Sequence, residues 1–196
     1  MRDISRIVPD PTALKALVHP DRLKMLGLLR VEGPATATSL AARLGLNTGA
    51  TSYHLRQLAA HGFIEADPER GTRRERWWKA RHEATVFEAS GAEGAALDAG
   101  LAMTQAVISH HAAAMQRAHD TYDRLPPEWR RAQSLNDFTI PLSPEGAKAL
   151  VDAMLELLWR AKRDAPEPGA PLPEGWRPFT IHLHGFPYVP EGEGEP

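Results

Sequence analysis

The segment that decides the fold runs from Leu40 to Leu58 and reads LAARLGLNTGATSYHLRQL. Its first half has the apolar spacing of a short helix, and Gly45 is the type of residue that ends one. Asn47 is a favourable N-cap, so we expect a second helix that continues to about His61. Two helices joined by a tight turn that contains glycine predict a helix-turn-helix.

The second of these helices has an apolar face and a polar face. Thr51, Leu55 and Leu58 recur at helical spacing, so we expect them to face the core. The start of the second helix of a helix-turn-helix enters the major groove of DNA, where base edges distinguish all four base pairs. The residues that we therefore expect to contact DNA are Thr48, Gly49, Ala50, Ser52, Tyr53 and Arg56. Tyr53 and Arg56 are the candidates for direct contact with the bases.

A β-hairpin is predicted directly after this helix. Residues 63–67 and 72–79 have the composition of two strands, and residues 68–71 read as the turn between them. Arginines gather at or beside the turn, where a hairpin that flanks DNA contacts the backbone or the minor groove. The arginines that we expect to contact DNA are Arg70, Arg73 and Arg74.

Two helices are predicted before the deciding segment, and both begin with a clear signal. Asp10 is an N-cap candidate followed by proline, and Pro20 fits the first turn of the next helix. Leu26 and Leu29 belong to an apolar repeat on the buried side of that helix. Thr36 is a favourable N-cap for the first helix of the helix-turn-helix.

These elements together resemble a known family. Residues 17–29 read LVHPDRLKMLGLL, and the helix-turn-helix and the hairpin follow in order. Residues 11–80 of the chain resemble the arsenic-repressor (ArsR) winged-helix transcription regulators. The resemblance implies a homodimer on an inverted-repeat operator, acting as a repressor that an inducer releases. It also places residues 48–56 on the recognition helix and residues 70–74 on the wing.

The chain departs from the metal-sensing members of that family at one position. Those members have paired thiols at the start of the third helix, where this sequence has Thr36-Ala37-Thr38. Hydroxyls do not replace thiolates as ligands for a soft ion, so an arsenic-type sensor is excluded. The region after Gly91 is longer than in the small metal sensors and resembles relatives with an extra domain.

The second half of the chain predicts a long helix over residues 91–123. An apolar stripe with alternating steps of four and three is the pattern of a contact between two helices. Residues of this stripe that we expect to form a dimer interface are Leu97, Leu101, Ile108 and Met115. Packing of the same stripe on the chain's own first domain stays open. Strands are predicted over Ser134–Leu142 and Pro178–Pro187, with an amphipathic helix between them that ends near Arg163.

Histidines in the second half provide an alternative interpretation. His182 and His184 share one face of the second predicted strand, which is a spacing that two ligands of one metal ion can have. The sequence near them offers no third histidine or carboxylate, so we expect no metal site. A zinc- or nickel-responsive regulator that uses this pair stays open as an alternative, as does a winged-helix module that binds protein.

Composition and charge restrict the classes of function that this protein can have. The chain has 196 residues, no cysteine and a formal net charge of −2. Residues 1–82 carry 14 Lys and Arg against 8 Asp and Glu, whereas residues 83–196 carry 9 against 17. The first part therefore attracts a polyanion and the second repels it. Phosphate-binding loops, zinc-protease helices and serine elbows do not occur in the sequence, so we expect no enzyme and no cofactor.

The sequence therefore predicts a mainly helical α+β protein. We expect an N-terminal arm over 1–10, a winged helix-turn-helix domain over 11–82, a C-terminal dimerisation and effector domain with two short strands over 91–187, and a disordered tail over 188–196. The expected partners are double-stranded DNA, a second copy of the chain and an unidentified small-molecule effector. No apolar stretch approaches the length of a membrane span, so we expect a cytoplasmic protein.

Overall fold

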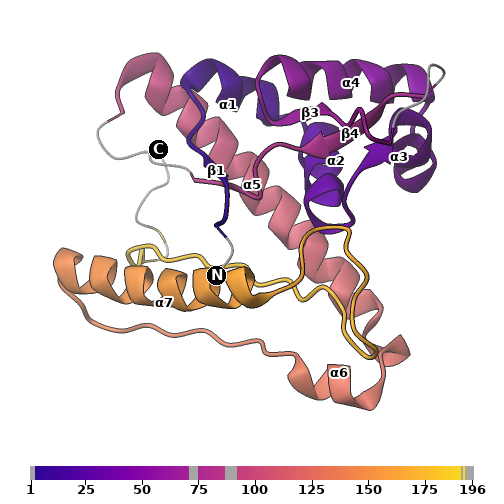
Figure 1. Cartoon of the computed structure of the whole chain (residues 1–196). Coiled ribbons are helices and arrows are strands. Elements are labelled where there is room, and N and C mark those ends of the chain that lie inside the picture. Colours follow the sequence, from indigo (N-terminus) through magenta and orange to yellow (C-terminus); the bar gives the residue numbers. More distant parts are fainter. Residues whose placement is uncertain (1–2, 71–74, 87–91, 191, 193–196) are drawn as a thin grey trace. The chain divides into compact units, whose positions relative to one another are not determined.

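The computed structural model describes residues 3–70, 75–86, 92–190 and 192 (Figure 1). The predicted fold class is confirmed, because the described chain is mainly helical with a few short strands. It forms two compact units. The first, called here the winged-helix unit, contains residues 2–115 and 166–178, and the second, called the C-terminal unit, contains residues 116–165 and 179–196.

The helices of the winged-helix unit begin and end where local capping groups dictate. Asp10 accepts a hydrogen bond from the backbone N–H of Ala13 at 2.8 Å, and Thr36 and Ser39 form a reciprocal capping box. Gly45 ends its helix with a φ of 67°, a conformation that suits glycine. These helices are α1 (Pro11–Leu17), α2 (Pro20–Val31), α3 (Ala37–Leu44) and α4 (Thr48–Ala60).

The unit contains a three-stranded antiparallel sheet, and two of its strands follow α4 and confirm the predicted hairpin. Its strands are β2 (Ala35–Thr36), β4 (Trp77–Ala80) and β3 (Ile64–Ala66), in that order across the sheet. Trp78 lies opposite Ala35 on one side and Ala66 on the other. As expected for neighbours on a strand, Trp78 is buried and Trp77 is only partly so.

A second, parallel pairing joins the predicted N-terminal arm to the segment after the hairpin. Strand β1 (Arg6–Ile7) pairs with β5 (Ala84–Thr85). Arg30 of α2 supports this pairing because its guanidinium donates to the carbonyl of His82 at 2.8 Å and to the hydroxyl of Thr85 at 2.9 Å. Burial lowers the pKa of Arg30 to about 10, so this side chain stays protonated at neutral pH.

The core of the winged-helix unit lies among α1, α2, α4 and the sheet. Its largest fully buried side chains come from the three helices and from the residue just before β3, and include Leu17, Met25, Leu29, Leu55, Leu58 and Phe63. Thr51 is buried with Leu55 and Leu58, which confirms the predicted inner face of α4. Burial on this scale fixes the orientation of α4, because turning the helix would expose its apolar side chains.

The long helix α5 (Gly94–Asp120) contributes to this core by a face that the apolar stripe did not predict. Ala99, Gly100 and Met103 are buried, and Val107 packs against the core cluster. The predicted dimer residues lie on a different face of the helix, roughly 120° away from the buried one, because successive residues on a helix are rotated by about 100°. Leu97, Leu101, Ile108 and Met115 are between 39% and 61% exposed.

Two glycines allow a distant segment to join the winged-helix unit. Gly33, with a φ of 86°, follows α2, and Gly169, with a φ of 76°, lies in the segment 166–178. A Cβ atom added at Gly33 would lie 2.7 Å from the Cα atom of Gly169. A side chain at either position therefore forces the two backbones apart.

The C-terminal unit contains the helix α6 (Pro127–Ala132), the 3-10 helix η1 (Tyr122–Arg124) and α7 (Pro144–Asp164). Helix α7 confirms the predicted amphipathic helix, with the hydroxyl of Ser143 accepting from the N–H of Gly146. The strands predicted over Ser134–Leu142 and Pro178–Pro187 are wrong, because both segments are irregular. Their alternating apolar residues have no neighbouring strand to pair with, and a strand requires one.

No described residue of the C-terminal unit is buried. Phe138 is 82% exposed and Leu135 is 96% exposed. Trp129 and Phe179 make an aromatic contact with ring centroids 6.3 Å apart. The unit therefore lacks a core of its own.

Within the described residues, every helix of the protein is too short or too polar to span a lipid bilayer.

Candidate nucleic-acid interface

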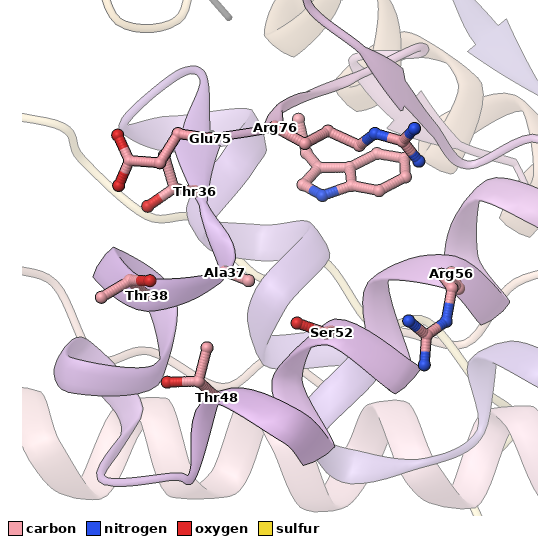
Figure 2. Close-up of a pocket in the computed structure, with 9 residues that line it drawn as sticks. Thr36, Ala37, Thr38, Thr48, Ser52, Arg56, Glu75 and Arg76 are labelled. Atoms are coloured by element: carbon pink, nitrogen blue, oxygen red, sulfur yellow. The ribbon is translucent and has the colours of Figure 1, made fainter. Parts of the chain in front are cut away.

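A hollow lined by polar and apolar groups opens between the two helices of the helix-turn-helix and the hairpin (Figure 2). It measures about 300 Å³. The first turn of α3, one face of α4 and the start of β4 line it, and each of these elements belongs to the winged-helix unit. The lining residues are Thr36, Ala37, Thr38, Thr48, Ser52, Arg56, Glu75, Arg76 and Trp78.

The N-terminal ends of two helices contribute to this hollow. Thr36 is the N-cap of α3, and Thr48 is the first residue of α4, whose N-cap Asn47 accepts from the N–H of Ala50 at 2.7 Å. Backbone N–H groups at a helix start carry a partial positive charge and attract anions. Arg56 and Arg76 add two full positive charges against the single carboxylate of Glu75.

The structure places the predicted residues of α4 on two neighbouring faces. Thr48, Ser52 and Arg56 follow one another at intervals of four residues and line the hollow. Tyr53 lies on the adjacent face, and half of its surface is exposed. Gly49 and Ala50 lie in the first turn.

Gly49 has a structural role that the sequence prediction did not include. A Cβ atom added there would lie 3.3 Å from the side-chain oxygen of Asn47, which caps the helix. A larger residue would therefore crowd the capping group. The same absence of a side chain leaves the backbone of this turn accessible.

The predicted arginines of the hairpin are only partly described. Arg70 forms an ion pair with Asp67 at 3.8 Å, and its side chain is 56% exposed. Arg73 and Arg74 lie outside the described residues. Arg76 lies over the ring of Trp78, with its guanidinium carbon 5.4 Å from the ring centroid, so the indole holds this arginine at the edge of the hollow.

Sequence reasoning missed part of this surface. Thr36 was predicted only as an N-cap, Ala37 and Thr38 only as part of the segment where a metal sensor has thiols, and no role in DNA contact was predicted for these residues or for Glu75. The signal was available, because Thr36 was predicted as an N-cap and the helix start after it carries unpaired N–H groups. The orientation of that start toward α4 and the hairpin depends on tertiary packing, which the local pattern does not contain.

The residues predicted for other roles lie elsewhere. Leu97, Leu101, Ile108 and Met115 are exposed on α5, away from the core of the winged-helix unit. The imidazole rings of His182 and His184, in the C-terminal unit, have centroids 6.5 Å apart. Within the described chain, this pair does not belong to a group of three or more metal-binding side chains.

Comparison with known proteins supports the domain type. A family described as a helix-turn-helix domain matches residues 17–66, from the end of α1 to the end of β3. No curated protein matches the chain. The elements α2 to β4 and this match together define a winged helix-turn-helix domain, and they support a DNA-binding regulator.

Solved structures that resemble the chain do so at low identity. The transcriptional regulator Tm0710 from Thermotoga maritima is 16% identical, with a TM-score of 0.33, over 78% of this chain and 84% of that one. A mutant of Lactococcus lactis ZitR in apo form is 14% identical, with a TM-score of 0.33, over 74% of this chain and 83% of that one. RV1404 from Mycobacterium tuberculosis is 17% identical, with a TM-score of 0.31, over 74% of each chain.

Proposed function

We propose that this protein is a cytoplasmic, sequence-specific transcriptional regulator of the ArsR-like type, and that it is not an enzyme. The observation that carries the proposal is the hollow of Figure 2, where two helix starts, Arg56 and Arg76 converge beside an exposed helix face. This arrangement favours the phosphates of a duplex at the hollow and its base edges along α4. Thr48, Ser52, Tyr53 and Arg56 are the residues that we assign to the recognition surface.

We further propose that the protein binds an inverted-repeat operator as a homodimer and acts as a repressor. One recognition helix reads only a few base pairs, so two helices about 34 Å apart read successive major grooves on one face of the duplex. The exposed stripe of α5 supports a contact between two copies, because the other face of this helix is already used by its own domain. Arg70, Arg73 and Arg74 are assigned to the flanks of each half-site.

An effector would act through the C-terminal unit. Its described residues expose large apolar side chains and bury none, so this unit has apolar surface available for a ligand or a second copy. Residues 83–196 carry 9 Lys and Arg against 17 Asp and Glu, and this acidic balance favours a position of that half of the chain away from DNA. Release of the operator by a small molecule is therefore assigned to this half of the chain.

Selection of bound fragments from genomic DNA tests the proposal. The purified protein is expected to enrich fragments that share two inverted half-sites, and binding to them should fall steeply with salt. The logarithm of the affinity should decrease by about 0.9 per decade of salt for each phosphate that the protein neutralises. Enrichment without symmetry would contradict the dimeric operator, and no enrichment would contradict DNA recognition.

A matched pair of variants locates the surface. Arg56→Ala should weaken binding to an enriched fragment, whereas Arg117→Ala, on the exposed part of α5, should leave it unchanged. Binding that survives Arg56→Ala would contradict the assignment of the hollow. If Arg56→Ala abolished DNA binding but a partner protein still bound, the result would favour the alternative of a winged-helix module that binds protein.

A further inference from the structure

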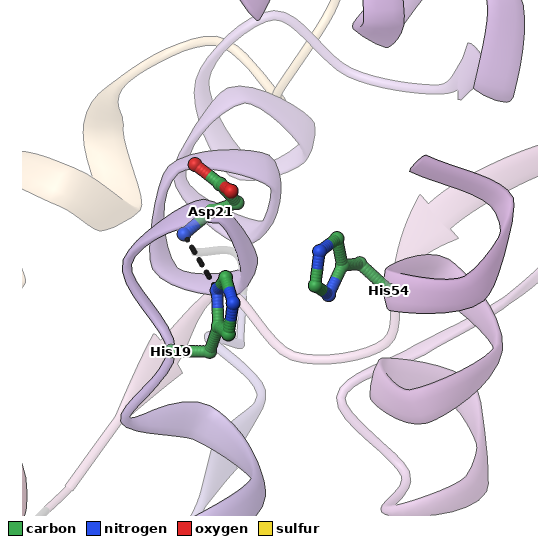
Figure 3. A group of neighbouring side chains, drawn as sticks. All are labelled: His19, Asp21 and His54. Carbon is green, nitrogen blue, oxygen red and sulfur yellow. Dashed lines mark hydrogen bonds between the residues drawn. The ribbon is translucent and has the colours of Figure 1, made fainter. Parts of the chain in front are cut away.

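A group of three metal-binding side chains lies on the side of α4 that faces α2. His19 is the N-cap of α2, Asp21 lies in the first turn of that helix, and His54 lies in the middle of α4 (Figure 3). One nitrogen or oxygen atom from each side chain lies within 4.8 Å of the others. The ring centroids of His19 and His54 are 4.4 Å apart, with the ring planes at 45°. All three residues belong to the winged-helix unit.

The imidazole of His54 leaves one of its nitrogens without a partner. Its Nδ1 atom is buried and makes no hydrogen bond to any described residue. A buried polar atom without a partner costs free energy, so the fold retains it against a penalty. A metal ion bound at this nitrogen would remove the penalty. Coordination is a role that a neutral imidazole nitrogen fills well.

The other two side chains are positioned by the helix start. Nδ1 of His19 accepts from the backbone N–H of Asp21 at 3.2 Å, which orients the ring. If Nε2 of His19 binds a metal, the proton moves to Nδ1 and this long hydrogen bond is exchanged for the metal bond. The carboxylate of Asp21 lies 3.7 Å from the ammonium group of Lys24, a partly exposed ion pair that a stronger ligand contact can replace.

The surrounding charges decide which ions fit. Burial, and after it the charges of His19 and Arg22, lower the pKa of His54 against the opposite effect of Asp21, so the ring stays neutral at neutral pH and available as a ligand. Positive neighbours and a helix start disfavour a hard cation held only by charge, such as Mg²⁺ or Ca²⁺. Two imidazoles and one carboxylate suit zinc and its first-row neighbours, which bind nitrogen strongly.

We propose that His19, Asp21 and His54 form a binding site for one divalent transition-metal ion, with zinc as the reference ion and water as the fourth ligand. Ligand atoms on a tetrahedral zinc ion lie about 3.3 Å apart, given bonds of about 2.0 Å. Binding therefore draws the start of α2 and the middle of α4 together. The ring of Tyr53 lies 5.5 Å from that of His54, so the movement reaches a residue of the recognition surface. The effect on DNA rests on the proposed function, whereas metal binding itself does not.

Cobalt and zinc titrations of the intact protein test the site without DNA. Co²⁺ should give the visible absorption of a four-coordinate nitrogen and oxygen site, and Zn²⁺ should displace it at one ion per chain, while excess Mg²⁺ should not. The wild-type protein alone answers this step. An absorption spectrum equal to that of hydrated Co²⁺, or no calorimetric heat with Zn²⁺, would overturn the proposal.

Variants identify the ligands. His54→Gln and Asp21→Asn should each lower the zinc affinity at least about tenfold, and Asp21→Asn keeps the backbone N–H that orients His19. The matched control is His61→Gln at the end of the same helix, and the double variant His182→Gln with His184→Gln tests the C-terminal pair. Melting by circular dichroism in chelator verifies that each variant is folded. If only the double variant lost zinc binding, while His54→Gln and Asp21→Asn kept it, the ion would be bound at the C-terminal pair. That result would overturn the assignment.

The final step measures DNA binding with and without zinc, by fluorescence anisotropy on an enriched fragment. Because binding pulls α4 toward α2, we expect zinc to weaken DNA affinity by at least about fivefold, and Asp21→Asn to remove the effect. If the protein binds zinc but enriches no DNA fragment, the proposed function is contradicted and the metal site stands. If it enriches DNA fragments but binds no zinc, the metal site is contradicted and the proposed function stands.

Discussion

The two units of this protein use their apolar residues in opposite ways. In the winged-helix unit Phe63 is fully buried, whereas in the C-terminal unit Phe138 is 82% exposed. The difference is not one of composition alone, because α7 has a clear apolar face that its unit leaves partly exposed. The helices and strands of the first unit bury its core residues against one another. The described apolar residues of the second unit are not buried, so they would need another surface to cover them.

This contrast bears on how each unit would function. A domain with a complete core holds α4 in one orientation, which recognition of DNA requires. A unit without a core depends on what it contacts for its packing, so a second copy or a ligand changes its free energy strongly. The stable half therefore suits reading of DNA, and the dependent half suits control.

The largest effect expected is on stability. Phe63→Ala should lower the free energy of unfolding by about 3–5 kcal/mol, because it removes a fully buried ring. Phe138→Ala, the matched change in the C-terminal unit, should alter it by less than about 0.5 kcal/mol. Urea unfolding followed by circular dichroism measures both. If both variants lost the same free energy of unfolding, the second unit would have a core, and the difference between the two units would not hold.

The next effect concerns association. Leu101→Asp combined with Ile108→Asp should convert a dimer into a monomer, because two charges would be buried in the contact at a cost of several kcal/mol. Light scattering gives the molar mass directly. Leu135→Asp, at an exposed position outside the stripe, is the control. A wild-type protein that is monomeric at high concentration would remove the dimer from the proposal.

A smaller effect is expected at the recognition surface. Arg56→Ala should weaken operator binding by about 1–3 kcal/mol with little change in stability, because the side chain is exposed. Fluorescence anisotropy gives the affinity, and thermal melting gives the stability. A loss of stability as large as the loss of affinity would indicate a structural role instead.

Capping should have a smaller effect still. Asn47→Ala removes the acceptor for the N–H of Ala50 and should cost about 1 kcal/mol of stability. Asn47→Asp keeps an acceptor oxygen and should recover most of this loss. If both variants lose the same amount, the cap does not stabilise α4 as the geometry indicates.

The smallest expected effect is on pH dependence. Burial and the charges of His19 and Arg22 lower the pKa of His54 in the folded protein below its usual 6.5. The unfolded chain therefore binds a proton first, so this contribution to stability is complete above about pH 6.5 and is lost as the pH falls through the lower, folded pKa. His54→Gln should flatten this decline in melting temperature. An unchanged slope would assign the decline to other groups, such as His82.

Local signals predicted the winged-helix unit well because its helices begin and end at strong caps. Thr36, Gly45 and Asn47 act within a few residues of their own positions, so the sequence contains the whole interaction. The strand predicted over Ser134–Leu142 failed for the converse reason. Alternation describes one strand, but a sheet needs a neighbour, and the pattern carries no information about one.

The candidate site was predicted where it lies on one helix and missed where it depends on contacts between elements. Thr48, Ser52 and Arg56 share a helix face that spacing alone reveals. The inner face of α5 was missed because alanine and glycine mark it only weakly in an apolar pattern. The approach of His19 to His54 joins residues far apart in sequence, so only the folded chain shows it.

The pairing of β1 with β5 has a practical consequence for handling this protein. The residues before α1 pair with the segment that follows the hairpin, and two hydrogen bonds from Arg30 stabilise that segment. Fusions or truncations that disturb residues 6–7 would loosen the exit of the hairpin as well as the start of the chain. Affinity tags are therefore better attached at the other terminus.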